Sequence, residues 1–210
     1  MTPAKGSSLS IKGIIFDLDG TLVDVPYDWQ RIRSELETRG KPILTHLQSL
    51  EEPERTAKWK KLEKFEHEAT LKARLKKGIH ELLDYLTRIG VRQALVTNNT
   101  KKNVIFLLNK FRLDFDYILT RESGLWKPSG RPFVTVLDWF DLRKDECCVI
   151  GDSHFDVQAA AEAGIAHVFI LSPRREDFSS THAHICESIP DVQKEIENLF
   201  LDVDKGKAQS

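Results

Sequence analysis

Short apolar runs alternate with longer amphipathic segments along most of this chain. That alternation is typical of a parallel sheet covered by helices on both faces. The runs that we interpret as strands are Ile11 to Phe16, Val91 to Thr97, Tyr117 to Thr120, Cys147 to Gly151, His167 to Leu171 and Ala183 to Cys186. The helical segments are Ile79 to Ile89, Lys101 to Lys110, Arg131 to Phe140, Phe155 to Ala163 and Asp191 to Phe200. We therefore predict an α/β fold with a Rossmann-like parallel sheet.

One interval, from Asp24 to about Lys77, has no strand signal and breaks the alternation. Its apolar residues recur at three- and four-residue intervals, which is the spacing of one helical face. These residues are Trp59, Leu62, Phe65 and Ala69. We predict a small, all-helical cap inserted after the first strand. The predicted parts are a discontinuous core of 11–23 and 78–201, a cap of 24–77, and flexible tails at 1–10 and 202–210.

The second half of this interval is rich in positive charge, with eight Lys or Arg residues from Lys58 to Lys77. The favoured interpretation is a solvated helix face, whose charge is balanced by Glu63, Glu66 and Glu68. The alternative is an electropositive lid that faces an anionic substrate.

Composition narrows the class of protein. Among 210 residues there are 31 Lys and Arg against 32 Asp and Glu, which gives a formal net charge of −1 and no basic excess for binding nucleic acid. No run approaches the roughly 20 apolar residues that span a bilayer. The start "MTPAKGSSLS" lacks the apolar stretch of a signal peptide. The three cysteines form neither a disulfide framework nor a zinc motif. We expect a cytoplasmic protein that binds neither nucleic acid nor membrane; its oligomeric state stays open.

Polar side chains follow three of the predicted strands, and a lysine lies in the loop after a fourth. They are Asp17 and Asp19 after the first strand, Thr97 and Asn98 after the second, Asp152 after "CCVIG", and Lys127 in "GLWKPSGRPF". Ligands of an open parallel sheet bind beyond the carboxyl ends of its strands, so we expect these side chains to meet. Carboxylates, a hydroxyl and an ammonium at one edge are the groups needed to hold Mg²⁺ and a phosphate.

The two carboxylates in "DLDG" repel each other and resist desolvation, which predicts a positive partner. Mg²⁺ binds oxygen ligands, and Asp17 and Asp152 are the natural carboxylates to supply them. With its charge shielded, Asp17 can attack phosphorus as a nucleophile and form an aspartyl-phosphate. Asp19, two residues further on, is placed to donate a proton to the leaving alcohol and then to accept one from water.

The remaining polar residues suit a bound phosphoryl group. The Thr97 hydroxyl and the loop amides can bind phosphate oxygens, and Lys127 can neutralise the charge that develops in the transition state. We therefore predict a Mg²⁺-dependent phosphatase that acts on a small phosphorylated metabolite.

Four segments carry a resemblance to a known family. "DLDGT" (17–21), "VTNN" (96–99), "KPSGRPF" (127–133) and "GDSHFD" (151–156) resemble, in order and spacing, the motifs of the haloacid dehalogenase-like hydrolases. Within that superfamily the chain looks like the phosphoglycolate phosphatase-like group, whose helical cap follows the first strand. The resemblance covers Ile11 to Phe200. The cap, at about fifty residues, is shorter than the family's usual helical bundle.

The resemblance implies a role for each motif residue. Asp17 would be the nucleophile, and Asp19 the acid and base, whose backbone carbonyl also contacts Mg²⁺. The resemblance also implies Thr97 and Asn98 as phosphate-binding residues, Lys127 as the lysine that stabilises charge, Asp152 as a metal ligand, and Asp156 as their support through water or Lys127.

Other functions on the same fold remain as alternatives. A haloacid dehalogenase needs no acid two residues after the nucleophile, so the presence of Asp19 argues against this activity. A phosphomutase would have to shield the aspartyl-phosphate from water, a task for which so short a cap is poorly suited. A non-catalytic interaction module would not need the motif acids, yet none is replaced.

The substrate is not specified by any motif. Candidate contacts to its non-phosphate end are Tyr27, Trp29, Arg31, Arg33 and Trp126. We expect His154 to face solvent, and Cys147 and Cys148 to act as small hydrophobic residues of a strand.

Overall fold

Six parallel strands form the central sheet of the computed structural model, which describes residues 11–207, with side chains described as far as residue 199. Their order across the sheet is β5-β4-β1-β6-β7-β8. The strands are β1 (Gly13–Phe16), β4 (Arg92–Val96), β5 (Tyr117–Leu119), β6 (Cys147–Gly151), β7 (His167–Leu171) and β8 (His184–Cys186). Each corresponds to one of the predicted strands, although four of them are shorter by one or two residues. The predicted flexible tail at 1–10 lies outside the described residues.

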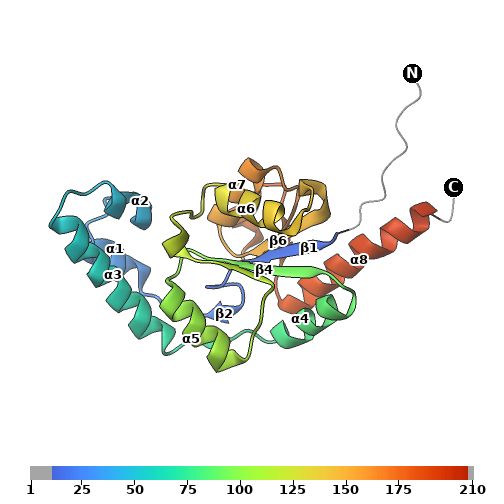
Figure 1. Ribbon diagram of the computed structural model, residues 1–210, viewed down its shortest axis with the longest axis horizontal. Coiled ribbons are helices and arrows are strands. Elements are labelled where there is room, and N and C mark those ends of the chain that lie inside the picture. Colours follow the sequence, from blue (N-terminus) through green and yellow to red (C-terminus); the bar gives the residue numbers. More distant parts are fainter. Residues whose placement is uncertain (1–10, 208–210) are drawn as a thin grey trace, which may run out of the picture.

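Helices cover both faces of the sheet, as predicted (Figure 1). One face carries α4 (Ile79–Arg88), α5 (Lys101–Phe111) and α8 (Ile189–Lys207), and the other carries α6 (Arg131–Phe140) and α7 (His154–Ala163). Three single-turn 3₁₀ helices, η1 (Arg121–Ser123), η2 (Lys144–Glu146) and η3 (Arg175–Phe178), lie in the connections. Within residues 11–207, no helix combines the length and apolar character needed to cross a bilayer.

The alternation of side chains along β1 explains the two layers. Ile14 and Phe16 pack into the hydrophobic cluster under α4, α5 and α8, whereas Ile15 packs into the cluster under α6 and α7. Successive side chains of a strand point to opposite faces, so one continuous apolar run supplies both cores. The predicted α/β fold is confirmed.

Two helices begin earlier than predicted because a serine caps each. Ser153 caps α7, which starts at His154 instead of Phe155. Ser188 precedes α8, where its Oγ accepts a hydrogen bond from Asp191 N at 3.3 Å. Helix α8 therefore starts at Ile189 instead of Asp191, and it continues to Lys207, past the predicted end at Phe200.

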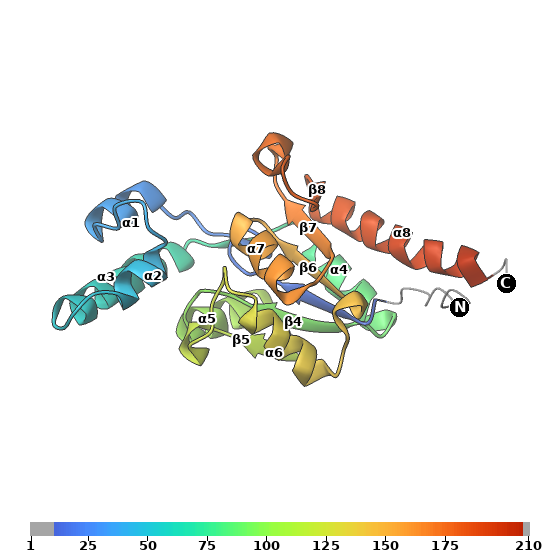
Figure 2. The same ribbon diagram turned by 90° about the horizontal axis from the view of Figure 1, so that it is seen from above.

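A small group of helices follows β1, as predicted, and lies at one end of the sheet (Figures 1 and 2). It consists of α1 (Trp29–Glu35), α2 (Ile43–Gln48) and α3 (Glu54–Thr70). These helices share a hydrophobic cluster of their own, formed by Ile32, Leu36, Leu44, Leu47 and Leu62 with Trp59 and Phe65 packed against it. Ala69 was predicted on the same face but is absent from this cluster.

The positive charge of the insertion is neutralised locally. Lys58 pairs with Glu37 at 2.7 Å and with Glu54 at 2.8 Å, and Lys76 pairs with Asp24. None of the eight basic residues from 58 to 77, all of which the structure describes, lines the cleft reported below. These contacts favour the solvated-face interpretation over the electropositive lid.

The insertion is not wholly helical, which corrects the prediction. Two short strands, β2 (Val23–Asp24) and β3 (Arg74–Leu75), pair antiparallel where the chain enters and leaves it. A strand of two residues is too short to show a periodicity of two, and its existence depends on a partner about fifty residues away. Pattern analysis of either segment alone could not find it.

The fold predicts unequal effects of two substitutions on α5. Leu107 is fully buried in the sheet-facing cluster, whereas Ile105 is 48% exposed on the opposite side of the helix. Leu107→Ala should lower the free energy of unfolding by about 2–5 kcal/mol, because it removes buried methyl groups and leaves a cavity. Ile105→Ala, the matched control, should change it by less than about 0.5 kcal/mol. Urea denaturation measures both, and equal effects would contradict this placement of α5.

Candidate active site

Three adjacent strands present polar side chains at one edge of the sheet. Because β1 lies between β4 and β6, Asp17 follows the central strand and has Thr97 on one side and Asp152 on the other. The chain passes from β1 to β4 and β5 on one side of the sheet, and then to β6, β7 and β8 on the other side of β1. Ligands of doubly wound folds bind at the point where the strand order reverses in this way. A cleft of about 600 Å³ opens between this edge and the helical insertion. The six residues expected from the sequence to converge, Asp17, Asp19, Thr97, Asn98, Lys127 and Asp152, all line it.

A buried lysine holds two carboxylates at the floor of the cleft. Lys127 Nζ lies 2.6 Å from Asp17 Oδ1 and 2.6 Å from Asp156 Oδ1. All three side chains are more than nine-tenths buried. Burial disfavours the charged form of Lys127, but the carboxylates of Asp156 and Asp17 outweigh that effect and raise its pKa above the ordinary value. Lys127 therefore carries its positive charge at neutral pH.

The same floor holds more negative than positive charge. Asp17, Asp152 and Asp156 each offer a carboxylate oxygen, and the three oxygens lie within 4.8 Å of one another. Burial, followed by repulsion between the carboxylates, raises the pKa of Asp152, and burial also raises the pKa of Asp17. A hard divalent cation would relieve this repulsion, and oxygen donors are the ligands that Mg²⁺ prefers.

The loop after β1 is shaped to approach Asp152. Gly20 has a φ of +88°, and a Cβ at this position would lie 1.9 Å from Asp152 Oδ2. Only glycine both adopts this backbone conformation readily and leaves room for the carboxylate. The loop and Asp152 thus pack closely enough for Asp17 and Asp152 to share one cation.

Asp156 lies beside the site, and both of its carboxylate oxygens already accept hydrogen bonds. Its two oxygens accept hydrogen bonds from Lys127 Nζ at 2.6 Å, Ser153 Oγ at 2.6 Å and the backbone N–H of Ser153 at 3.1 Å. The bonds with Ser153 form a capping box at the start of α7. The "GDSHFD" segment therefore serves as a helix cap and, through Asp156, as a partner of Lys127.

Asp19 is half-buried and is held by two donors. Its Oδ2 accepts a hydrogen bond from Asn99 Nδ2 at 2.8 Å, and its Oδ1 accepts one from the Tyr27 hydroxyl at 3.3 Å. Burial raises the pKa of Asp19 to about 6, although the bonds from Asn99 and Tyr27 lower it. A carboxyl group with this pKa can hold and release a proton near neutral pH.

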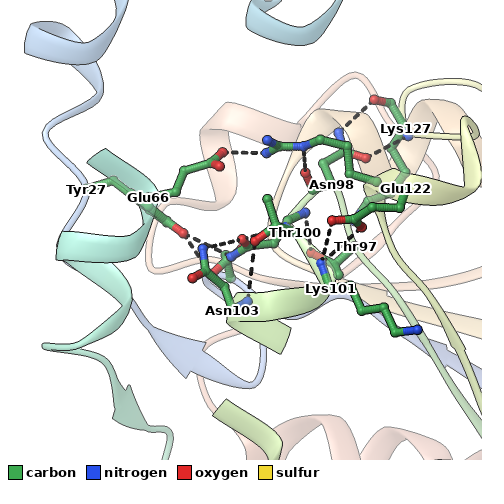
Figure 3. A network of polar contacts seen from close by, with 12 residues as sticks. Tyr27, Glu66, Thr97, Asn98, Thr100, Lys101, Asn103, Glu122 and Lys127 are labelled. Atoms are coloured by element: carbon green, nitrogen blue, oxygen red, sulfur yellow. Dashed lines mark hydrogen bonds and ion pairs between the residues drawn. The ribbon is translucent and has the colours of Figure 1, made fainter. Parts of the chain in front are cut away.

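Thr97 and Asn98 differ in what they can offer a phosphate. The Thr97 hydroxyl is buried at the cleft and accepts a hydrogen bond from Asn99 N at 3.1 Å. The Asn98 side chain instead bonds the Lys127 backbone twice, at 2.8 Å to its carbonyl and at 2.9 Å from its N–H (Figure 3). This side chain ties the lysine loop to the end of β4, so both of its polar atoms are already engaged by the protein.

A buried ion pair between insertion and core was missed by the sequence analysis. Glu66 of α3 binds Arg121 at 2.5 Å, and Arg121 Nε also donates to the Asn98 carbonyl at 2.8 Å (Figure 3). Glu66 was predicted to lie on a solvated face, but only 5% of it is exposed. One signal was present, because Glu66 follows Leu62 by four residues and so shares its helical face.

Asn99 and Tyr27 were also missed as partners of Asp19, and Asn103 was missed as a partner of Asn99. Asn99 lies inside the quoted "VTNN" motif, but its neighbour Asn98 was chosen. Tyr27 was predicted to contact substrate, whereas its hydroxyl faces Asp19. No sequence signal identified Asn103, whose contact with Asn99 depends on the turn that begins α5.

The other predicted contacts line the cleft unevenly. The lining includes Tyr27, Trp29, Arg33 and Trp126 but not Arg31, whose guanidinium lies 5.3 Å from the Phe65 ring. His154 is exposed, as expected, and it stacks on Phe178 at the cleft rim. Cys147 and Cys148 are buried in β6, as predicted.

Comparison with known proteins identifies related sequences and structures. The sequence profile described as haloacid dehalogenase-like hydrolase matches residues 26–170, a segment that begins after Asp17 and Asp19. An uncharacterised hydrolase of Saccharomyces cerevisiae is 27% identical over 197 residues, covering 89% of this chain and 90% of its own. A phosphoglycolate phosphatase of Pseudomonas savastanoi pv. phaseolicola is 30% identical over 189 residues, covering 75% of this chain and 68% of its own.

The fold is likewise shared with solved structures. The crystal structure of a predicted phosphoglycolate phosphatase from Haemophilus somnus 129PT superimposes with a TM-score of 0.67 at 25% identity. The match covers 89% of this chain and 98% of that one. The six-stranded sheet and the helical insertion are therefore features of a wider group of proteins.

The geometry predicts a Mg²⁺ site that can be measured without any assay of activity. At a Mg²⁺ concentration about 100 times Kd, binding should raise the free energy of unfolding by about 2.7 kcal/mol. Asp152→Asn should weaken binding at least about tenfold, because it removes one of the anionic ligands. Isothermal titration calorimetry and thermal unfolding measure the two effects.

The control for this prediction is Asp138→Asn, which changes an exposed carboxylate on α6 and should leave binding unchanged. Protons compete with the cation for Asp17 and Asp152, since the pKa of each is raised. Affinity should therefore increase from about pH 5 to about pH 8. Equal binding by wild type and Asp152→Asn would contradict the site.

Proposed function

The chain belongs to the haloacid dehalogenase-like hydrolases, and we propose that it is a Mg²⁺-dependent phosphatase that hydrolyses the phosphate monoester of a small metabolite. One observation carries the proposal: Asp17 lies buried at the floor of a cleft, with Lys127 Nζ at 2.6 Å. A carboxylate in a cleft beside an ammonium is suited to attack an anionic phosphoryl group. The phosphoglycolate phosphatases among the relatives support this class of reaction.

Asp17 starts the reaction as the nucleophile. The oxygen that is not bonded to Lys127 forms a bond to phosphorus, while the bond from phosphorus to the alcohol oxygen breaks. Asp19 donates its proton to that oxygen, and the alcohol leaves. Lys127 keeps its charge beside the phosphoryl oxygens and stabilises the negative charge of the transition state.

A water molecule then releases the phosphate. Asp19, now a carboxylate, accepts a proton from the water as the oxygen of that water bonds to phosphorus and the bond to Asp17 breaks. Inorganic phosphate leaves, and both aspartates return to their first state. The hydrogen bonds from Asn99 and Tyr27 keep Asp19 at the cleft through both steps.

The donor set fits a divalent cation. Asp17 and Asp152, with the backbone carbonyl of Asp19, would hold Mg²⁺, and Asp156 would support them through Lys127. When bound, the cation offsets the repulsion between the attacking carboxylate and the phosphate oxygens. The Thr97 hydroxyl and the Asn98 N–H, which follow β4 on the other side of β1 from Asp152, would bind the phosphate.

The division of the chain follows from this arrangement. We propose that the segments 11–23 and 78–201 form the catalytic core and that 24–77 acts as a cap, because the insertion lines the cleft opposite Asp17. Cap residues Trp29 and Arg33 would contact the part of the metabolite beyond its phosphate. Three buried free cysteines suit the reducing cytoplasm.

Phosphate release tests the function. We expect hydrolysis of at least one member of a panel of sugar phosphates, phosphoglycolate, nucleotides and pyrophosphate with Mg²⁺, and none with EDTA. Asp17→Asn should fold normally and retain less than about a thousandth of kcat, because an amide is not a nucleophile. Asp138→Asn is the matched control and should remain fully active.

Two outcomes would exclude the proposal. Full activity in EDTA would mean that no cation takes part. Retention of a tenth of the activity by Asp17→Asn would mean that another group attacks phosphorus.

Asp19→Asn should reveal the role of the second aspartate through the leaving group. An alkyl phosphate needs a proton on its departing oxygen, whereas p-nitrophenolate leaves without one. We expect kcat/KM, which reports the steps up to departure of the leaving group, to fall at least about 100-fold with the alkyl ester and much less with p-nitrophenyl phosphate. Steady-state kinetics with both esters measure the difference, and an equal loss of kcat/KM with both would mean that Asp19 does not protonate the leaving group.

A further inference from the structure

A line of side-chain hydrogen bonds runs from His67 of the cap to Asp19. The backbone N–H of Thr100 determines which atom donates and which accepts in these bonds. The Thr100 N–H can only donate, and it lies 2.7 Å from Asn99, so the atom facing it must be the carbonyl oxygen Oδ1. The NH₂ group of Asn99 must then face the other way. It lies 2.8 Å from Asp19 Oδ2 and 3.1 Å from the Tyr27 hydroxyl.

The same logic extends outward from Asn99. Because Asn99 Oδ1 only accepts, the Asn103 atom 3.0 Å away must be Nδ2. Asn103 Oδ1 then faces His67 Nδ1 at 3.1 Å, so His67 must carry a hydrogen on that nitrogen. Figure 3 shows Asn103 and Thr100 at the start of α5, facing Tyr27. All three bonds run in one direction, from His67 on the cap helix to Asp19 in the core.

Burial makes this line of bonds specific. Asn99 is 2% exposed and Asn103 is 1% exposed, so neither amide can exchange its partners for water without cost. Rotating Asn99 by a half-turn would set its NH₂ against the Thr100 N–H and its oxygen against the Asp19 carboxylate. Both contacts would be repulsive, which leaves one favourable orientation.

We propose that Asn99 is a positioning residue for the acid and base Asp19, held in its orientation by Asn103 and, from the cap, by His67. This rests on the phosphatase function proposed above. Asn99 directs one carboxyl oxygen of Asp19 and leaves the other, Oδ1, beside Tyr27 to face the leaving group. Because His67 belongs to α3, docking of the cap and orientation of the acid are linked through two amides.

The test compares kcat/KM for two esters, because in the steps up to departure of the leaving group a residue that acts through Asp19 affects only the substrate that needs its proton. With an alkyl phosphate, we expect kcat/KM to fall at least about 30-fold in Asn99→Ala, about 10-fold in Asn103→Ala and about 3-fold in His67→Ala. With p-nitrophenyl phosphate, kcat/KM of each variant should stay within about 3-fold of wild type. Asn109→Ala, an exposed amide on the same helix, is the matched control and should not change either rate.

A double mutant separates positioning from a general structural role. If Asn99 acts through Asp19, adding Asn99→Ala to Asp19→Asn should cost less than about twofold more with the alkyl ester. Equal losses of kcat/KM with both esters in the single variants, or additive losses in the double mutant, would overturn the proposal.

A measurement that does not depend on activity keeps the proposal testable if Asn99→Ala fails to fold or if wild type shows no hydrolysis. The side-chain NH₂ protons of Asn99 and Asn103 should exchange slowly with solvent in NMR spectra of wild type, and faster in His67→Ala. If wild type hydrolyses neither these esters nor any member of the panel of phosphorylated metabolites, the phosphatase function has failed, and these exchange rates still decide whether the line of bonds exists. Unchanged exchange in His67→Ala would overturn it.

Discussion

The ammonium of Lys127, held between the carboxylates of Asp17 and Asp156, is the contact on which the catalytic edge depends. Each of these charges would be costly to bury alone, and each is stabilised by the others. The contact joins the end of β1, the loop before α6 and the first turn of α7, three segments far apart in the sequence. It also leaves the Asp152 carboxylate without a cationic side chain in hydrogen-bonding contact among the described residues, which creates the demand for a metal ion.

The fold and the location of the site could be predicted from the sequence because both depend on simple periodicities. Apolar runs identify strands, and the carboxyl ends of parallel strands converge whatever the loops do, so Asp17, Thr97 and Asp152 were certain to meet if the strands were right. Side-chain partners do not follow from periodicity. Asn98 turned out to bind a backbone segment, and Glu66 a buried arginine, because each choice depends on atoms brought together only by folding.

The insertion uses different chemistry on its two sides. Apolar residues of α3, such as Leu62, pack against α1 and α2, whereas the contacts toward the core include an ion pair from Glu66 and a hydrogen bond from His67. Packing within the insertion is therefore mainly apolar, whereas its contact with the core combines these polar bonds with Trp126, which packs against the cluster of the insertion.

Strands β2 and β3 pair where the chain enters and leaves the insertion, so both covalent connections to the core pass through one narrow junction. The ends of the inserted segment 25–73 are thus held side by side regardless of what lies between them. The entropy of closing a loop grows only slowly with its length, so segments of very different size could occupy this junction with little effect on the sheet. Under the proposed function, substrate recognition could thus be exchanged as a module in evolution while the residues at the ends of β1, β4 and β6 stay unchanged.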